Sequence, residues 1–411
     1  MMSIKKVFLT VVFAWMVFFT IQAKTRKVVY IVLDGIPADY VERVRPKTVF
    51  DIADKGAYAR GYTGGEIGGY SQTPTISAVG YTNILTGTWL NKHNVPGNSN
   101  LKPNYNYWSI FRIAKEQQQD FKTALFSSWV DNRTVLIGEG KEETNQLQID
   151  YVYDGYELDK TRFPEKKDHK QIFEIDSVVC QKAAASIRRD APDLSWVYLW
   201  YTDSGFHLYG DGAFMDDYVN KTDQLIAQIW EAVQYREKMF DEDWLVIVTT
   251  DHGRSESGHG HGGQSERERS VWISTNQKKV NNHFGSASLS LVDILPTICH
   301  FMDFDVPRDL AFEQDGISFL GKNDISALKT SPYDDTVVLS WNSSSTNNKA
   351  IIYMATTNHF KEGGVEEWIE LGEVPAKAGA FTVDLSQYPA SKFYKFVVST
   401  PHNALNRWLR K

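Results

Sequence analysis

The sequence predicts an α/β protein with a doubly wound, mostly parallel sheet, followed by a small C-terminal β-sandwich. Three apolar runs typical of buried strands, at 27–33, 194–200 and 244–250, are each followed closely by an aspartate. Stretches with the apolar spacing of amphipathic helices, at 176–190 and 215–238, alternate with them. This alternation favours parallel pairing, which gathers the carboxyl ends of strands, and the ligands of the fold, at one edge of the sheet.

The first run, KVVYIVLDG at 27–35, is typical of a strand that delivers Asp34 to its C-terminal loop, although an ordinary turn aspartate fits too. Downstream, the stretch from Ser77 to Leu85 can form a helix with Ser77 in its first turn. Free backbone N–H groups at a helix start lower the pKa of a nucleophile and hold an anion. Serine is also a preferred N-cap, so both interpretations of Ser77 stay open.

Residues 103–194 mix aromatic, helical and polar pieces, including a predicted strand at 123–129, and we expect loops there that cover a substrate. The strand that begins at Leu194 leads into Asp203 and His207, which are four residues apart. If this turn is helical, both side chains lie on one face and can bind one ion.

The third run leads into DHGRSESGHGHGG, from Asp251 to Gly263. A strand that ends in Asp-His and continues into a glycine-rich loop with two more histidines, His259 and His261, indicates a metal site. The alternative is a flexible, solvated loop, since a short motif alone has a real false-positive rate.

Beyond this loop, residues 266–275 continue as a strand and residues 288–304 have the periodicity of a buried helix. From about Ser331 the chain offers short β-like runs separated by Asn, Ser, Gly and Pro, which predicts a small β-sandwich. We therefore expect a catalytic domain over 24–325 and a β-module over 331–411. The module faintly resembles a fibronectin type III domain.

Residues 1–23 combine a basic start, an apolar run and a small residue, Ala23, and predict a cleaved signal peptide and a secreted or periplasmic protein. An uncleaved anchor is the alternative, but the run is shorter than a spanning helix, so no anchor is expected in the mature chain. The net charge of −7 argues against binding to nucleic-acid polymers.

Cys180 and Cys299 lie in separate helical stretches, which favours two buried thiols over a disulfide.

Five motifs, in order, carry a family resemblance: VLDG, PTISAVGYTNILTG, DSGFH, DHG and GHGG, followed by DILPTI and DGISFL. Over residues 27–320 the chain resembles the alkaline phosphatase superfamily, in its type I phosphodiesterase/nucleotide pyrophosphatase-like branch. The resemblance implies an alkaline phosphatase-like fold and a phosphoric ester hydrolase that works through a phosphoserine intermediate on Ser77. It also implies two divalent metal ions, with zinc expected.

The resemblance divides the candidate ligands into two sets around Ser77. The first metal would bind Ser77, Asp34, Asp251 and His252; the second would bind Asp203, His207 and a loop histidine. His261 heads the matching HGG, so we prefer it to His259, which remains the alternative ligand. Gly80 and Tyr81 are candidate substrate-binding residues.

The departures from the family pattern bear on the substrate. Ser77 is followed by Ala78, Val79, Gly80 and Tyr81, and this lack of a nearby cation favours phosphodiesters over monoesters. Lys122, Arg133 and Lys141 are the cations that could reach in from the covering segment. The sulfatase branch needs a proline and an arginine where Val79 and Tyr81 stand, so we set it aside.

The expected substrate is a small phosphate ester or a phosphorylated glycan or lipid headgroup. Alternatives within the superfamily are a phosphomonoesterase and a phosphoethanolamine-type transferase. An alternative of another class is a non-catalytic surface-binding protein on this scaffold, which loss of a ligand would favour, yet every expected position is filled.

Overall fold

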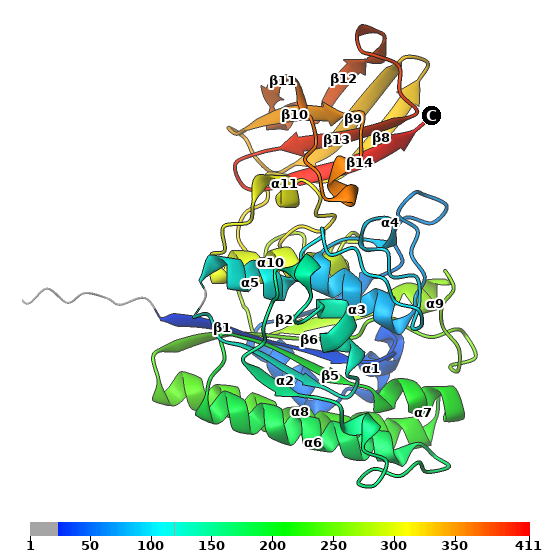
Figure 1. Ribbon diagram of the computed structural model, residues 1–411, viewed down its shortest axis with the longest axis vertical. Helices are drawn as coiled ribbons and strands as arrows, with labels where there is room; N and C mark the ends of the chain where they lie inside the picture. The colour runs from blue at the N-terminus through cyan, green and yellow to red at the C-terminus, as the bar shows by residue number, and fades with distance from the viewer. Residues whose placement is uncertain (1–23, 119) are drawn as a thin grey trace, which may run out of the picture.

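The computed structural model describes residues 24–118 and 120–411 (Figure 1). The predicted signal peptide, residues 1–23, lies outside the described residues. In the described part, no helix is long and apolar enough to cross a membrane.

A seven-stranded sheet forms the centre of the larger part, with the order β2-β7-β6-β1-β5-β3-β4. Neighbours from β6 to β4 pair in parallel, whereas β7 is antiparallel to both β2 and β6. This sheet confirms the predicted mostly parallel α/β architecture. Its strands are β1 (Thr25–Leu33), β2 (Ala57–Tyr62), β3 (Thr123–Ser127), β4 (Tyr151–Tyr153), β5 (Leu194–Leu199), β6 (Glu242–Thr249) and β7 (Ser270–Thr275).

Helices cover both faces of this sheet (Figure 1). Along β1, Val29 and Ile31 pack into the core beneath one layer of helices. Val28 and Tyr30 pack into the opposite core, so the period-two alternation of a strand divides its side chains between two buried faces. The first layer holds α1 (Ala38–Val44), α2 (Lys47–Lys55), α6 (Lys170–Arg189) and α8 (Ala213–Met239), and the second holds α3 (Ser77–Thr86), α5 (Ile110–Gln117) and α10 (Ile294–Met302).

The register of the central strands sets where the functional residues emerge. Leu33 pairs with Leu199 of β5, and Val32 pairs with Thr249 of β6. The chain therefore leaves all three strands at the same edge, and the predicted aspartates follow there. Three short helices are α4 (Leu90–His93), α7 (Tyr201–Tyr209) and α9 (Glu266–Arg269), of which α7 follows β5 at this edge. A fourth, α11 (Arg308–Ala311), lies beneath the C-terminal module (Figure 1).

Two antiparallel sheets form the C-terminal module, with the orders β11-β10-β13-β14 and β12-β9-β8, around a separate apolar core. The predicted β-sandwich is thus present, and its likeness to fibronectin type III remains a prediction. The strands are β8 (Ile325–Tyr333), β9 (Thr336–Ser343), β10 (Lys349–Ala355), β11 (Ile369–Pro375), β12 (Ala380–Asp384), β13 (Phe393–Ser399) and β14 (Ala404–Arg410).

The sequence analysis missed β8 and β14, and β8 spans the boundary expected near Ser331. Polar and apolar residues do not alternate regularly in either strand, and Pro332 lies within β8, which hides their strand character in the sequence. The module begins about where the catalytic chain ends, with no separate linker between Asp324 and β8.

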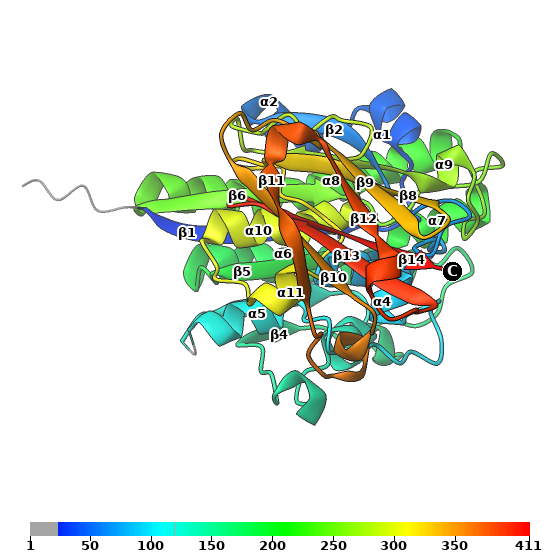
Figure 2. The ribbon, with the colours of Figure 1, turned by 90° about the horizontal axis from the view of Figure 1, so that it is seen from above.

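The module stands over the helical layer that contains α5 and α10, on the side of the sheet opposite α6 and α8 (Figure 1). Figure 2 shows its strands lying across that layer from above. A buried ionic cluster joins the two parts: Lys395 of β13 contacts Glu313 and, at 2.7 Å, Glu366. From the catalytic side, Lys92 reaches Asn406 of β14 at 2.8 Å. We therefore expect the two parts to depend on each other for stability.

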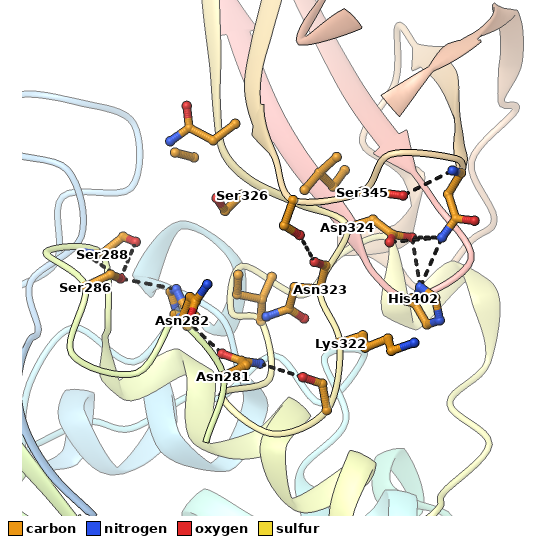
Figure 3. Close-up of a pocket in the computed structure, with 18 of the residues that line it drawn as sticks. Asn281, Asn282, Ser286, Ser288, Lys322, Asn323, Asp324, Ser326, Ser345 and His402 are labelled. Atoms are coloured by element: carbon orange, nitrogen blue, oxygen red, sulfur yellow. Dashed lines mark hydrogen bonds and ion pairs between the residues drawn. The ribbon is translucent and has the colours of Figure 1, made fainter. Parts of the chain in front are cut away.

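A second feature of the junction is a cleft of about 780 Å³ between the two parts (Figure 3). Amides and hydroxyls line it, including Asn282 and Ser345, and Asp324 inside it accepts hydrogen bonds from Asn348 and His402. None of the predicted site residues lines this cleft. The candidate active site lies elsewhere, at the carboxyl edge of the central sheet.

Replacing Lys395 by methionine should lower the free energy of unfolding by about 3–5 kcal/mol, because Glu313 and Glu366 would stay buried without their cation. The matched control is Lys349→Met, which breaks an exposed pair with Glu373 and should cost about 0–1 kcal/mol. Chemical denaturation followed by tryptophan fluorescence measures both. Equal, small losses in the two variants would contradict a stabilising interface.

Candidate active site

Two buried aspartates emerge side by side from neighbouring strands. Asp34 directly follows β1, and Asp251 follows β6 by two residues. Each has one carboxylate oxygen tied to the protein: Asp34 Oδ2 accepts hydrogen bonds from the hydroxyls of Tyr81 and Tyr198, and Asp251 Oδ1 accepts one from the Gly35 amide at 3.0 Å. The other oxygens, Asp34 Oδ1 and Asp251 Oδ2, each lie 3.3 Å from His252 Nε2.

His252 and Ser77 complete this first group. Nδ1 of His252 lies 2.9 Å from the carbonyl of Gly253, so it carries the proton and leaves the Nε2 lone pair toward the carboxylates. Ser77 Oγ lies 3.2 Å from that Nε2 and 3.4 Å from Asp34 Oδ1. Ile76, not Ser77, occupies the N-cap of α3, so the plain N-cap interpretation of Ser77 is wrong.

A second group of donors adjoins the first. Asp203 and His207 lie one turn apart on α7, as their spacing predicted. His207 Nε2 is 3.3 Å from Asp203 Oδ1 and 3.1 Å from His261 Nε2, and the latter is 3.5 Å from the same oxygen. Nδ1 of His261 is bonded to the carbonyl of Thr75 at 2.9 Å, which again directs Nε2 into the group.

These distances fit metal ligands. Zinc binds imidazole nitrogens and carboxylate oxygens at about 2.0–2.2 Å in a tetrahedron, which separates the donor atoms by roughly 3.3–3.6 Å. Asp251 Oδ2 is buried and has no hydrogen-bond partner among the described residues, as expected of an oxygen that awaits a cation. Two overlapping sets, Asp203 with His207 and His261, and Asp34 with Asp203 and His252, each bring their donor atoms within 4.8 Å of one another.

The electrostatics of the first group call for a positive charge. Burial and the neighbouring Asp34 carboxylate raise the pKa of Asp251 well above its ordinary value. Burial opposes a charged imidazole, yet Asp251 and Asp34 raise the pKa of His252 to about 9. Either a proton on His252 or a bound cation can supply this charge. In the second group, burial lowers the pKa of His261 to about 4, which keeps it a neutral ligand.

Arg254 is a functional candidate that the sequence analysis missed. It is fully buried, and its guanidinium bonds to the Asp203 carboxylate and to the carbonyls of Gly35, at 2.9 Å, and His259, at 3.1 Å. In the sequence, the signal that could have pointed to Arg254 is its position three residues after Asp251. Although burial opposes it, this guanidinium contributes to holding the pKa of Asp203 well below its usual range. Arg254 therefore holds α7 in place, and its guanidinium is not available to bind an anionic substrate.

Two of the three cations that could reach in from the covering segment pair with carboxylates outside the site. Lys122 lies just before β3, at the opposite edge of the sheet, and pairs with Asp150 at 3.1 Å. Arg133 pairs with Asp154 and Glu139, at 2.7 and 2.6 Å. Lys141 lies in a turn and makes no ion pair within the described part of the chain. Lys122 and Arg133 are therefore not available as the cation that could reach in.

Gly80 and Tyr81 occupy positions that differ from the expected contact with substrate. A side chain at Gly80 would lie 2.7 Å from the carbonyl oxygen of Asp251, so glycine lets α3 pack directly on that backbone. The Tyr81 hydroxyl is buried against Asp34. Burial and the Asp34 charge raise the pKa of Tyr81 and of Tyr198, so both phenols remain protonated donors.

Asn98 is a second residue that the sequence analysis missed. Its Oδ1 accepts a hydrogen bond from the Ala78 amide at 2.9 Å, next to Ser77. This bond leaves Nδ2, a neutral donor, without a hydrogen-bond partner among the described residues. No sequence motif marks it, because its position depends on how the loop from 94 to 98 folds back onto the start of α3.

His259 lies outside the donor group that holds His261. Its Nδ1 contacts the carbonyl of His207 at 3.1 Å, and its ring packs against Gly210.

Cys180 and Cys299 are both free and buried, as the helical pattern favoured.

Comparisons with known proteins agree with this architecture. A sequence model of the family described as type I phosphodiesterase/nucleotide pyrophosphatase matches residues 28–279. Among curated proteins, no sequence matches this chain.

Solved structures with similar folds share little sequence. A 2-O GAG sulfatase is 11% identical over 89% of this chain and 86% of its own, with a TM-score of 0.51. Ps i-CgsB, solved with k-i-k-neocarrahexaose, is 14% identical over 78% of this chain and 82% of its own, with a TM-score of 0.50. A protein in the alkaline phosphatase superfamily from Vibrio parahaemolyticus is 12% identical, covers 80% and 76%, and has a TM-score of 0.46. At such identities the likeness concerns the fold.

His261→Ala should lose one bound metal ion, because His261 Nε2 lies with the donors of the second group. His259→Ala is the matched control and should keep the full metal content, since its ring contacts the backbone instead. Elemental analysis of the two purified variants measures this. Equal metal loss in both would mean that the loop shares ligation between its histidines.

Proposed function

The chain belongs to the type I phosphodiesterase/nucleotide pyrophosphatase family, and from this premise we propose that it is an exported, metal-dependent phosphodiesterase with Ser77 as its nucleophile. The observation that carries the proposal is the position of Ser77 Oγ, 3.2 Å from His252 Nε2 and 3.4 Å from Asp34 Oδ1. A hydroxyl beside a buried carboxylate and an imidazole is suited to activation rather than to packing. The N-terminal sequence supports export.

Each side chain has a role in this proposal. Asp34, Asp251 and His252 would hold one cation and Asp203, His207 and His261 the other. When bound, two divalent cations ionise a serine hydroxyl, polarise the ester and stabilise the leaving oxygen. Ser77 Oγ forms a bond to phosphorus while the bond to the leaving alkoxide breaks. Water then attacks the phosphoserine and releases Ser77.

The start of α3 orients the substrate for this attack. Ser77 is the first residue of the helix, where backbone N–H groups and the helix dipole favour an anion. The free Nδ2 of Asn98 is a neutral donor on the same side as Ala78 and is available to a non-bridging phosphate oxygen.

The charges around Ser77 favour diesters. A monoester dianion needs a cation beside the metals, as guanidinium groups best supply. Arg254, the buried cation of the site, is committed to Asp203 and to backbone carbonyls. A diester has one charge fewer, and a neutral donor such as Asn98 suits it. We accordingly propose small phosphodiesters or the diester headgroups of glycans or lipids as substrates.

Ser77→Ala should lower kcat/KM for a diester by roughly 10³-fold or more while leaving the fold intact, because no neighbouring group can replace the nucleophile. Thr75→Ser is the control, since the hydroxyl of Thr75 bonds Gly262 and Gly263 in the histidine loop and serine keeps those bonds. Steady-state kinetics and circular dichroism measure activity and fold. A Ser77→Ala enzyme with near-normal turnover would place the nucleophile elsewhere.

A nitrophenyl phosphodiester should be hydrolysed with a kcat/KM at least about tenfold above that of nitrophenyl phosphate, at equal metal loading, because Arg254 is not free to bind a dianion. Nitrophenyl sulfate is the third substrate of the comparison, since similar folds include a sulfatase. A tenfold preference for the monoester, or for the sulfate, would overturn the diester assignment.

A further inference from the structure

We propose that Tyr81 and Tyr198 are positioning residues that select zinc at the first metal site by occupying one oxygen of Asp34. The inference rests on the proposed function only in that Asp34 holds a metal. It concerns how two side chains behind a ligand bias the site toward the zinc that the family resemblance implies.

The two phenols converge on a single carboxylate oxygen. The hydroxyl of Tyr198 lies 2.7 Å from Asp34 Oδ2, that of Tyr81 is in contact with the same oxygen, and the two hydroxyls lie 2.8 Å apart. A carboxylate oxygen only accepts hydrogen bonds, whereas each phenol has a single proton to donate. Both protons can therefore serve Oδ2, and this oxygen is saturated within the protein.

Two side chains of helix α3 contact the two oxygens of Asp34. Ser77 and Tyr81 are four residues apart on α3 and thus lie on one face. Ser77 Oγ approaches Oδ1 at 3.4 Å, while Tyr81 holds Oδ2. Tyr198 completes the arrangement from β5, and the centroid of its ring lies 4.8 Å from that of the Tyr81 ring. The carboxylate cannot rotate to offer Oδ2 without breaking two buried hydrogen bonds.

The same restriction acts on the second carboxylate of this group. Asp251 Oδ1 is bonded to the Gly35 amide, and only Oδ2 lacks a partner in the described structure. Each aspartate thus offers one oxygen. Together with His252 Nε2 and Ser77 Oγ, this makes four donor atoms, the number that a tetrahedral zinc site takes.

Larger cations, and cations that prefer octahedral coordination, need more than four ligand atoms. Calcium takes six to eight oxygens and often binds carboxylates through both oxygens, and manganese favours octahedral oxygen-rich sites. By withholding Oδ2, the tyrosine pair limits the number of oxygens and thereby disfavours such ions. Zinc, which binds each carboxylate through a single oxygen here, loses nothing by the restriction.

The chain offers a matched control for the loss of a buried hydroxyl. Tyr30 on β1 is fully buried, its ring stacks on Trp196 at 5.8 Å, and its hydroxyl has no hydrogen-bond partner among the described residues. Tyr30→Phe therefore removes the same atom as Tyr81→Phe and Tyr198→Phe, without removing a bond to Asp34. All three changes preserve the ring and its packing.

The test measures zinc and manganese affinities by competition with a chromophoric chelator. The full-length, metal-stripped protein is used in a His261→Ala background, which leaves the first site as the one to be filled. Tyr81→Phe and Tyr198→Phe should each weaken zinc binding by about 10–100-fold, as expected when a group that orients a ligand is lost. Manganese binding should weaken much less, because the freed Oδ2 of Asp34 becomes available to a cation that takes more oxygen ligands, so that the zinc-to-manganese affinity ratio falls. Tyr30→Phe should leave both affinities unchanged.

Three outcomes are decisive. Zinc affinities of both tyrosine variants within twofold of Tyr30→Phe would overturn the inference, and so would equal loss for zinc and manganese, which would reduce the pair to structural support. If the unsubstituted protein bound neither metal, the proposed function itself would fail. If one variant does not fold, as judged by thermal unfolding, the other provides the same test.

Discussion

The repulsion between two buried carboxylates, Asp34 and Asp251, is the constraint on which the site depends. Both are almost fully inaccessible to solvent, and each places one oxygen 3.3 Å from the same imidazole nitrogen. Burying two like charges costs several kcal/mol per ion unless positive charge accompanies them. The arrangement is thus tolerable only with a cation at its centre, whether a proton on His252 or a metal, and the surrounding hydrogen bonds are arranged around that cation.

The fold supplies this geometry through a few close contacts. Parallel pairing of β1 with β5 and β6 brings the aspartates to one edge, and Gly80 lets α3 approach Asp251 closely enough to present Ser77. Arg254 then ties α7, the turn after β1 and the histidine loop to one guanidinium. Rigid elements therefore carry the donors, and the loop that holds His261 is anchored at Thr75.

Sequence reasoning found the residues that obey local rules. Asp34 and Asp251 follow apolar strands, and Asp203 and His207 have helical spacing, so periodicity alone brings them near one edge. Arg254, Asn98 and Tyr198 escaped because their partners are distant in sequence: Tyr198 is 164 residues from Asp34. A tyrosine inside a buried strand has the pattern of core packing until its hydroxyl is placed. Likewise β8 and β14 are strands because they pair with β9 and β13, and their own polar sequences do not predict this.

The charge balance of the whole centre links the missed residues to the choice of substrate. Three carboxylates, Asp34, Asp203 and Asp251, face one fixed guanidinium, so the protein contributes two net negative charges. With two divalent cations and an ionised Ser77, the centre would have a single positive charge. A phosphodiester anion neutralises it, whereas a monoester dianion leaves an excess negative charge in a partly buried site, where uncompensated charge is costly. Arg254 could correct that excess only by leaving Asp203. The clamp that shapes the second metal group thus also disfavours the dianionic substrate.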